Sequence, residues 1–206
     1  MGKPVIYTIG HSTHHFDYFH ELLRYYHVNC IVDVRSLAAS RFNPQFNKKS
    51  LAAALNGHNI DYLHLVDEFG ARQTDPIVLD KEGRVDFEKM RNTRKFKAGI
   101  KRLAKRVEKG YTIALMCAES DPLHCHRFLM ISPALKNFTV RHILKDKSIA
   151  TQQQLENEIR KLYREKGKKP GLFEAVASDD EDLKAAYRML NKEVAFSPAQ
   201  GKRKSN

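Results

Sequence analysis

Five short apolar segments recur along the chain, and they alternate with longer segments whose apolar residues have helical spacing. The short segments are rich in β-forming residues and predict strands at residues 5–9, 30–35, 60–65, 111–116 and 139–144. The longer segments predict helices at residues 12–26, 48–56, 86–109 and 124–135. Such alternation is typical of a parallel sheet with helices on both faces. We therefore expect an α/β fold with a five-stranded, mostly parallel sheet in a Rossmann-like or flavodoxin-like three-layer arrangement.

The α/β domain is expected to occupy residues 1–165, and residues 166–206 are expected to form a C-terminal extension. Within the domain, Ser12 or Thr13 is the expected N-cap of the first helix, and residues 66–82 read as one long loop. The spacing of Thr151 and Gln154 indicates a capping box that opens a helix through about residue 164. The extension then predicts a basic linker (166–171), an amphipathic helix (179–193) and a disordered basic tail (197–206).

Several classes of protein are disfavoured by the sequence. No apolar stretch approaches the roughly 18 residues that span a bilayer, and the first residues lack the apolar region of a secretion signal. The three cysteines are odd in number and form no CxxC pair, so we expect reduced thiols rather than a disulfide framework. These features predict a cytoplasmic protein without membrane partners.

Polar side chains follow four of the predicted strands at the points where the strands end. His11 and Ser12 follow the first strand, Asp33 and Arg35 end the second, and the others are His64 after the third and Cys117 and Glu119 after the fourth. The carboxyl ends of parallel strands lie at one edge of a sheet, where ligands of open α/β sheets bind. The sequence therefore places a site at this edge.

The segment 117–127 is the most reactive part of that edge. A thiol at a strand end, beside a helix N-terminus and cationic side chains, has its thiolate favoured. This argument makes Cys117 a candidate nucleophile, with Glu119 as general acid or base and His11 as a third catalytic candidate. Each also has a structural alternative: Cys117 as a buried core thiol, Glu119 as a helix cap and His11 as a hydrogen-bonded core histidine.

The remaining candidates are expected to bind an anionic substrate. An arginine at a strand end suits bidentate binding of phosphate or carboxylate, and the loop after the second strand offers further donors. The same loop residues would otherwise serve only to build the loop, and Asp33 with Arg35 would form an internal ion pair. The full set of anion-binding candidates is Ser12, Asp33, Arg35, Arg41, Asn43, Gln45, His64, Cys125, His126 and Arg127.

The sequence implies no cofactor. A zinc site built from Cys117, His124, Cys125 and His126 is disfavoured because adjacent residues such as Cys125 and His126 point about 100° apart on a helix. No P-loop or GxGxxG pattern indicates ATP or a dinucleotide.

The positive charge of the chain is concentrated in one segment. The net charge is +12, and residues 81–109 carry 12 Lys and Arg against 4 Asp and Glu. Basic patches of this kind attract nucleic acid, although a solvated helix face is an equally simple reading. The candidate polyanion patch comprises Arg91, Arg94, Lys95, Lys101, Arg102 and Lys105.

Several motifs together resemble one known family. They are YTIGHST (7–13), VDVRS (32–36), SRFNPQFN (40–47), YLHL (62–65), CAESDPLHCHR (117–127) and TQQQLE (151–156). This combination is similar to the family catalogued as domain of unknown function 488, over about residues 5–160. The resemblance implies a compact α/β fold in which these segments form the site, and it implies no reaction.

Three functions from different classes remain open. The first is an enzyme that binds a phosphate-bearing anion, a nucleotide or nucleic acid, in the pocket at the strand ends. The second is a rhodanese-like thiol enzyme that transfers sulfur or a phosphoryl group on a small anion. The third is a non-catalytic nucleic-acid-binding module. We favour the first, and the second stays an alternative because the loop from Cys117 to Arg127 is longer than the tight active loops of rhodanese-like enzymes and cysteine phosphatases.

Overall fold

The structure, a computed structural model, describes residues 2–166 and 178–201. Its centre is a mixed six-stranded sheet with the strand order β3-β2-β4-β1-β5-β6. The four pairings among the first five of these strands are parallel, and β5 pairs with β6 in the antiparallel direction. The strands are β1 (Val5–Gly10), β2 (Cys30–Asp33), β3 (Asp61–His64), β4 (Ile113–Cys117), β5 (Thr139–Ile143) and β6 (Ile149–Thr151).

The predicted α/β class is confirmed, but the prediction of a five-stranded, mostly parallel sheet is wrong. The missed strand, β6, has three residues, which is too short to show an alternating pattern. It returns beside β5 through a tight turn in which Lys147 has a positive φ of 69°. The Rossmann-like assignment stays a prediction.

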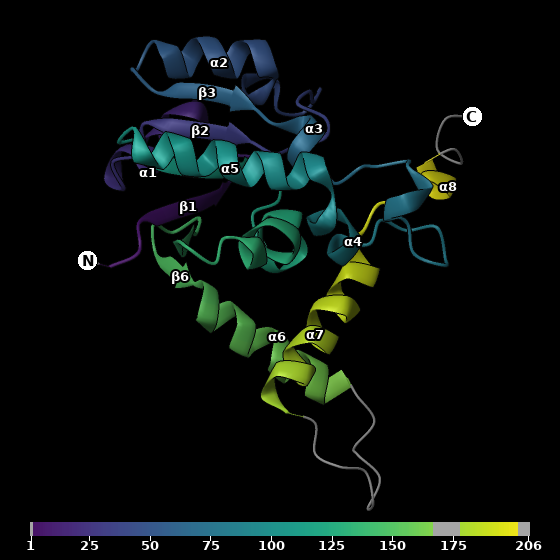
Figure 1. Cartoon of the computed structure of the whole chain (residues 1–206). Coiled ribbons are helices and arrows are strands. Elements are labelled where there is room, and N and C mark those ends of the chain that lie inside the picture. The colour runs from purple at the N-terminus through teal and green to yellow at the C-terminus, as the bar shows by residue number, and fades with distance from the viewer. Residues whose placement is uncertain (1, 167–177, 202–206) are drawn as a thin grey trace, which may run out of the picture.

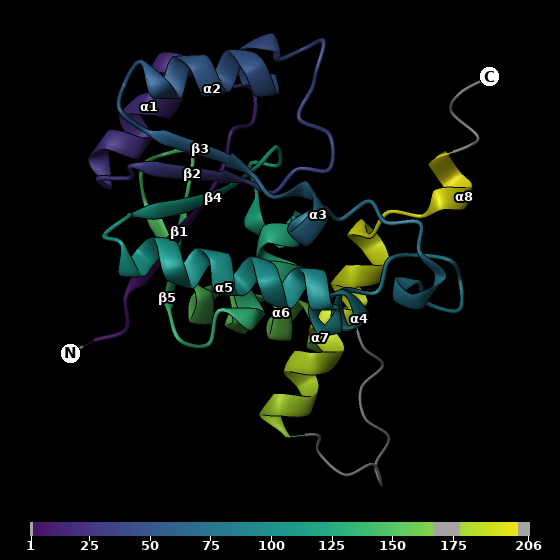
Figure 2. The same ribbon diagram turned by 45° about the horizontal axis from the view of Figure 1, so that its top comes forward.

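Helices cover both faces of the sheet, as the alternation predicts (Figures 1 and 2). Helices α1 (Phe16–Tyr25) and α2 (Lys48–Asn56) bury Phe19, Leu22 and Leu51 on one face, where they pack with Met116 of β4. The other face is covered by α3 (Val66–Phe69), α4 (Phe87–Asn92), α5 (Arg94–Glu108) and the segment after β4. All five residues of β4 are buried, because this strand is covered on both faces.

Two predicted helices are interrupted. The helix expected at residues 86–109 is split at Thr93, whose hydroxyl accepts a hydrogen bond from the Phe96 N–H and caps α5. The helix expected at residues 124–135 is instead three short segments: η3 (Pro122–His124), the π-helical turn η4 (Arg127–Ile131) and η5 (Ser132–Ala134). Pro133 contributes to this break because it has no N–H to donate to the preceding turn.

Local differences also occur at the helix ends and in the long loop. The N-cap of α1 is His15 rather than Ser12 or Thr13. The segment expected as one loop at residues 66–82 contains α3 and the turn η2 (Pro76–Val78). The capping box of α6 (Gln152–Lys166) is confirmed, since Thr151 and Gln154 exchange hydrogen bonds between side chain and backbone.

The expected C-terminal helix is present as α7 (Asp179–Val194), which packs against α6. Its residues Ala186 and Leu190 are buried in the same core cluster as β1 and β4. The tail expected to be disordered contains α8 (Pro198–Gly201), whereas most of the expected linker and residues 202–206 lie outside the described residues. Whether residues 1–165 form a separate domain stays a prediction. Among the described helices, none is long and apolar enough to cross a bilayer.

Candidate functional site

A pocket of about 270 Å³ lies at the carboxyl ends of β2 and β4. We call it the Cys117 pocket. Its floor is formed by Cys117, Glu119 and His126. Polar residues from the neighbouring loops surround the floor, namely Arg35, Ser36, Arg72 and His124. Apolar side chains close another side, namely Leu37, Phe87, Val194 and Phe196. The pocket lies at the sheet edge that the sequence predicts.

Four donor side chains converge at this floor. Ligand atoms of Cys117, Glu119, Cys125 and His126 all lie within 4.8 Å of one another. The Cys125 thiol is 3.2 Å from Oε2 of Glu119, and His126 Nδ1 is 3.7 Å from Cys117 Sγ and 3.9 Å from Cys125 Sγ. We call this group the Cys-Glu-His cluster. Cys117 and Cys125 are buried, whereas Glu119 is exposed over part of its surface.

The orientation of His126 is set by the backbone. Its Nε2 lies 3.0 Å from the carbonyl oxygen of Val34, which can only accept a hydrogen bond, so Nε2 carries a proton. The other ring nitrogen, Nδ1, consequently faces the two sulfur atoms. Val34 follows β2, so the second strand holds a side chain that comes from the segment after β4.

The two thiols of the cluster differ in acidity. Burial raises the pKa of Cys117 well above its usual value. Burial alone would also raise the pKa of Cys125, but the hydrogen bond with Cys117 and the positive charge of Arg127 outweigh it and lower this pKa. Burial raises the pKa of the Glu119 carboxyl. The thiolate expected at Cys117 is therefore favoured at Cys125, because the segment after Cys117 begins no long helix and the charge of Arg127 acts on Cys125.

Arg127 anchors the loop that carries the cluster. Its side chain has no exposed surface, and its guanidinium donates to the carbonyl oxygens of Glu119 at 2.6 Å and Ser120 at 2.9 Å. The same loop is tied to the end of β1, since the N–H of His11 donates to the Cys117 carbonyl at 2.9 Å. Arg127 does not line the Cys117 pocket, so its donors serve the loop rather than a bound anion.

Arg35 and Asp33 form an internal ion pair, the structural alternative considered from the sequence. Arg35 Nε and Nη2 donate to the two Asp33 oxygens at 2.9 and 2.6 Å, and Nη2 also donates to the Phe46 carbonyl. Arg35 Nη1 lies 3.0 Å from Nε2 of His11, whose Nδ1–H donates to the carbonyl of Ser12. Arg35 lines the Cys117 pocket, but Asp33, His11 and Ser12 do not.

Because two histidines are buried, we expect the free energy of unfolding to fall at mildly acidic pH. Burial lowers the pKa of His11 to about 4 and that of His142 to about 4, from the ordinary 6.5. Between these values the unfolded chain binds protons that the folded chain does not. The free energy of unfolding should be unaffected by these groups above pH 6.5 and should fall below it by about 1.4 kcal/mol per pH unit for each histidine. Urea unfolding at pH 7 and pH 5 measures this fall.

The matched variant for this prediction is His142→Gln. His142 is held between Thr8 and Gln152 by side-chain hydrogen bonds, away from the Cys117 pocket. Removing one of the two titrating groups should reduce the slope of stability against pH, whatever the variant does to stability at pH 7. An unchanged slope would contradict the assignment.

The other predicted anion-binding residues are used within the fold. His64 donates from Nε2 to the Arg35 carbonyl, and Gln45 donates from Nε2 to the His14 carbonyl. The backbone N–H of Asn43 donates to the Ser40 hydroxyl, which builds the loop locally. Neither these residues nor the exposed Arg41 line the Cys117 pocket.

The predicted polyanion patch separates into two parts. Arg91 belongs to α4 and is partly buried, and its Nη1 donates to the Leu129 carbonyl, so its inclusion on one basic helix face is wrong. The five other residues are exposed on α5, and we call them the α5 basic face: Arg94, Lys95, Lys101, Arg102 and Lys105. Of these, Arg102 pairs with Glu68 of α3.

Sequence reasoning missed Arg72 and the apolar wall of the pocket. The Arg72 guanidinium lies 5.6 Å from the ring centroid of Phe196, and the backbone N–H of Arg72 donates to the Ser36 hydroxyl. In residues 2–166 and 178–201, no carboxylate lies within ion-pair distance of it. The length of the loop after β3 could have drawn attention to Arg72. No pattern in the sequence indicates that Phe196 lies at this site.

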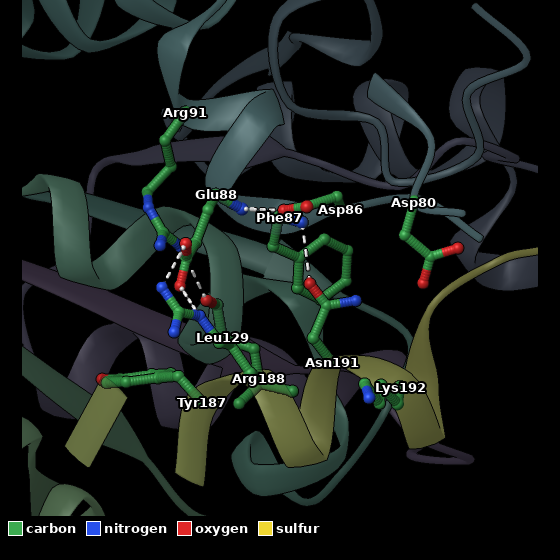
Figure 3. A pocket seen from close by; sticks show the side chains of 10 residues that line it. All are labelled: Asp80, Asp86, Phe87, Glu88, Arg91, Leu129, Tyr187, Arg188, Asn191 and Lys192. Atoms are coloured by element: carbon green, nitrogen blue, oxygen red, sulfur yellow. Dashed lines mark hydrogen bonds and ion pairs between the residues drawn. The ribbon is translucent and has the colours of Figure 1, made fainter. Parts of the chain in front are cut away.

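A second pocket, of about 150 Å³, lies between α4 and α7 and contains no residue of the Cys-Glu-His cluster (Figure 3). In Figure 3 the α7 side chains reach across to α4. Arg188 pairs with Glu88, and the Asn191 amide accepts from the Phe87 N–H and donates to the Val85 carbonyl. These contacts hold α7 in the position from which Phe196 reaches the Cys117 pocket.

Comparisons with known proteins agree with the resemblance found in the sequence. The family model described as "Domain of unknown function DUF488" matches residues 15–132. A search of curated proteins found no match, and a search of solved structures found none. The matched residues include Arg35, Arg72 and the whole Cys-Glu-His cluster, but not Val194 and Phe196 of the pocket wall. The chain therefore belongs to the DUF488 family.

Proposed function

We propose that the chain is an enzyme that binds a phosphate-bearing anion in the Cys117 pocket and acts on it at the Cys-Glu-His cluster. The observation that carries this proposal is the position of Arg72 beside a floor of Cys117, Glu119 and His126. A guanidinium without an ion-pair partner binds phosphate with charge-assisted hydrogen bonds. His124, also exposed at the pocket, supplies a further donor.

The volume of the pocket limits what enters it. About 270 Å³ lies just below the range typical of drug-sized ligands. A phosphate group with a small organic part fits this volume, and the remainder of a nucleotide or nucleic acid would extend beyond the rim. Arg35 contributes mainly by shaping the rim, since Asp33, Phe46 and His11 already occupy most of its donors.

Anion binding should raise the melting temperature. With inorganic phosphate at about 100 times its Kd, we expect a rise of about 5–10 °C, because a ligand that binds only the folded chain stabilises it. Arg72→Ala should remove most of this rise. Differential scanning calorimetry at constant ionic strength, with phosphate replaced by chloride in the reference, measures it.

The matched control is Arg141→Ala, because Arg141 is exposed on β5 and does not line the pocket. This variant should keep the full phosphate-dependent rise. Equal rises in Arg72→Ala and in the unsubstituted chain would show that phosphate binds elsewhere.

The contact between two thiols supports the rhodanese-like alternative. Cys117 faces the pocket, and Cys125 lies behind it in the same cluster. In that alternative Cys117 loses its proton to Cys125 and attacks the outer sulfur or the phosphorus atom of a small anion, and the group formerly bonded to that atom departs as the leaving group. Cys117→Ser separates the two enzymes from the non-catalytic module: it abolishes turnover in either enzyme, and it leaves binding unchanged in the module. The salt dependence of binding then separates the nucleic-acid functions from the small-anion enzyme.

The α5 basic face supports a second candidate function, binding of nucleic acid. Of its residues, Arg94, Lys95, Lys101 and Lys105 make no ion pair with the rest of the described chain. Figure 2 shows α5 along the sheet face opposite α1 and α2. Solvated cations along one helix bind the phosphate backbone and release its counterions.

Reversal of the charges at Lys101, Arg102 and Lys105 to Glu should flatten the plot of log K against log salt. The expected change is about one unit of slope for each phosphate that the variant no longer neutralises. Fluorescence anisotropy with a short labelled oligonucleotide at several salt concentrations measures it. Reversal of Arg24, Lys48 and Lys49, exposed on α1 and α2, is the charge-matched control and should leave the slope unchanged. If the slope of log K against log salt is the same in the two triple variants, α5 does not bind nucleic acid.

A further inference from the structure

We infer that the Cys-Glu-His cluster is a binding site for Zn²⁺ or a cation of the same ligand preference. Two thiolates, an imidazole and a carboxylate are the donor types that zinc takes in proteins, and four is its usual number of ligands. The cluster supplies four such atoms within 4.8 Å of one another. Two donors come from the end of β4 and the loop after it, and two come from the segment after η3.

The distances within the cluster fit a tetrahedral ion. A Zn–S bond of about 2.3 Å and a Zn–N bond of about 2.0–2.1 Å at the tetrahedral angle place sulfur and nitrogen about 3.6 Å apart. Nδ1 of His126 is 3.7 Å from Cys117 Sγ and 3.9 Å from Cys125 Sγ. Both sulfur atoms thus approach the same ring nitrogen at nearly the same distance. A single thiol hydrogen bond to Nδ1 would account for only one of these approaches.

His126 has the supporting contact that zinc-binding histidines need. Metal-bound imidazoles donate their second N–H to a carboxylate or carbonyl, which fixes the orientation of the ring. In this site the acceptor is the Val34 carbonyl, which lies 3.0 Å from Nε2. The arrangement leaves Nδ1 to bind the ion, with loss of any proton it carries.

The charge of the surroundings also fits a metal complex. Two thiolates and one carboxylate carry three negative charges, and Zn²⁺ neutralises two of them, so the complex keeps one. Arg127 is fully buried beside the cluster, and no described carboxylate lies within ion-pair distance of its guanidinium. A buried cation without a counter-charge is costly. The anionic complex would provide that counter-charge, because the Arg127 guanidinium donates to the carbonyl oxygens of Glu119 and Ser120 in the loop that carries Glu119.

The position of Glu119 indicates how such a site would meet a substrate. Three donors are buried, and Glu119, which is partly exposed, closes the cluster on the side of the pocket. Displacement of its carboxylate would open one position on the ion toward an anion held by Arg72. The inference deepens the proposed function and rests on it only for this role, because binding of the metal needs no substrate.

The test uses the full chain and zinc or cobalt ions as probes. Elemental analysis of protein purified without chelators should find about one zinc per chain. After removal of the metal, Co²⁺ should produce the thiolate charge-transfer and ligand-field absorption bands of a tetrahedral sulfur-containing site. Cys117→Ser and Cys125→Ser should each lose the metal, whereas Cys30→Ser should keep it, because Cys30 is buried in β2 outside the cluster.

A second measurement does not depend on folding of the variants. In the unsubstituted chain after removal of its metal, added zinc should slow alkylation of Cys117 and Cys125 by at least about tenfold and leave Cys30 unchanged, because a metal-bound thiolate is shielded from the reagent. Mass-spectrometric mapping gives the three rates. Absence of bound metal together with equal alkylation rates with and without zinc would overturn the inference.

The outcomes also separate the metal site from the proposed function. Arg72→Ala should keep the zinc and lose the phosphate-dependent rise in melting temperature. If the unsubstituted chain binds zinc but shows no phosphate effect, the proposed anion binding is wrong and the metal site stands. If the chain binds phosphate but takes up neither zinc nor cobalt, the metal site is wrong and the anion binding stands.

Discussion

Arg127→Ala is expected to lower the free energy of unfolding by about 3–5 kcal/mol, because it empties a large buried site and leaves buried acceptors without donors. The guanidinium of Arg127 holds the carbonyl oxygens of Glu119 and Ser120 at 2.6 and 2.9 Å. Its loss leaves both oxygens to find other partners, and the loop between the two halves of the Cys-Glu-His cluster loses its anchor. Urea unfolding followed by circular dichroism measures the change.

Arg141→Ala is the control for this prediction as well. Its side chain is exposed, and exposed substitutions of this kind change stability by about 0.5 kcal/mol or less. The variant Arg127→Met separates the two causes of the loss, since it keeps most of the side-chain volume and removes the hydrogen-bond donors. If Arg127→Met is as stable as the unsubstituted chain, the two carbonyl contacts do not contribute to the stability of the fold.

Gly10→Ala is expected to be almost as damaging, at about 3 kcal/mol, for a steric reason. A Cβ at position 10 would lie 1.9 Å from the carbonyl oxygen of Glu119, a backbone atom that cannot rotate away. The end of β1 and the loop after β4 would have to separate, which would break the hydrogen bond from the His11 N–H to the Cys117 carbonyl. We therefore expect both a lower melting temperature and a loss of the phosphate effect.

Gly57→Ala gives the matched control, since a Cβ there would meet only ordinary contacts at 3.5 Å and beyond. Gly57 has α-helical backbone angles, so alanine is expected to be neutral or slightly stabilising at this position. Equal stability of the two alanine variants would mean that the loop after β4 adjusts freely. That result would also weaken the claim that this loop holds the cluster in one geometry.

The sequence predicted the strands well where burial imposes a strong pattern. The five apolar runs became β1 to β5 with ends displaced by one or two residues, because each strand has apolar side chains that pack in or against the two core clusters. The edge of the sheet that carries the pocket could be predicted for the same reason, since parallel strands end on one side. The capping box at Thr151 was readable because it depends only on two residues three positions apart.

Other features depend on contacts that no local pattern contains. The break at Thr93 leaves the helical spacing of apolar residues nearly intact, so the pattern continues through it. The sequence disfavours a zinc site only if Cys125 and His126 lie on one continuous helix, where their side chains would point in different directions. The non-helical turn at Cys125, with φ −134° and ψ 139°, instead lets both side chains reach the cluster.

Phe196 and Val194, which form part of the wall of the Cys117 pocket, lie outside the part of the chain that the family model matches. The family match at residues 15–132 contains every donor of the Cys-Glu-His cluster and also Arg72. This part of the wall comes from Val194, the last residue of α7, and from Phe196 two residues later, whose carbonyl accepts a hydrogen bond from the Val85 N–H. The reactive groups are thus encoded separately from part of the surface that encloses them, since Leu37 and Phe87 lie within the family match and Val194 and Phe196 do not. A family member with a different C-terminal segment would present the same four donors in an opening of another shape.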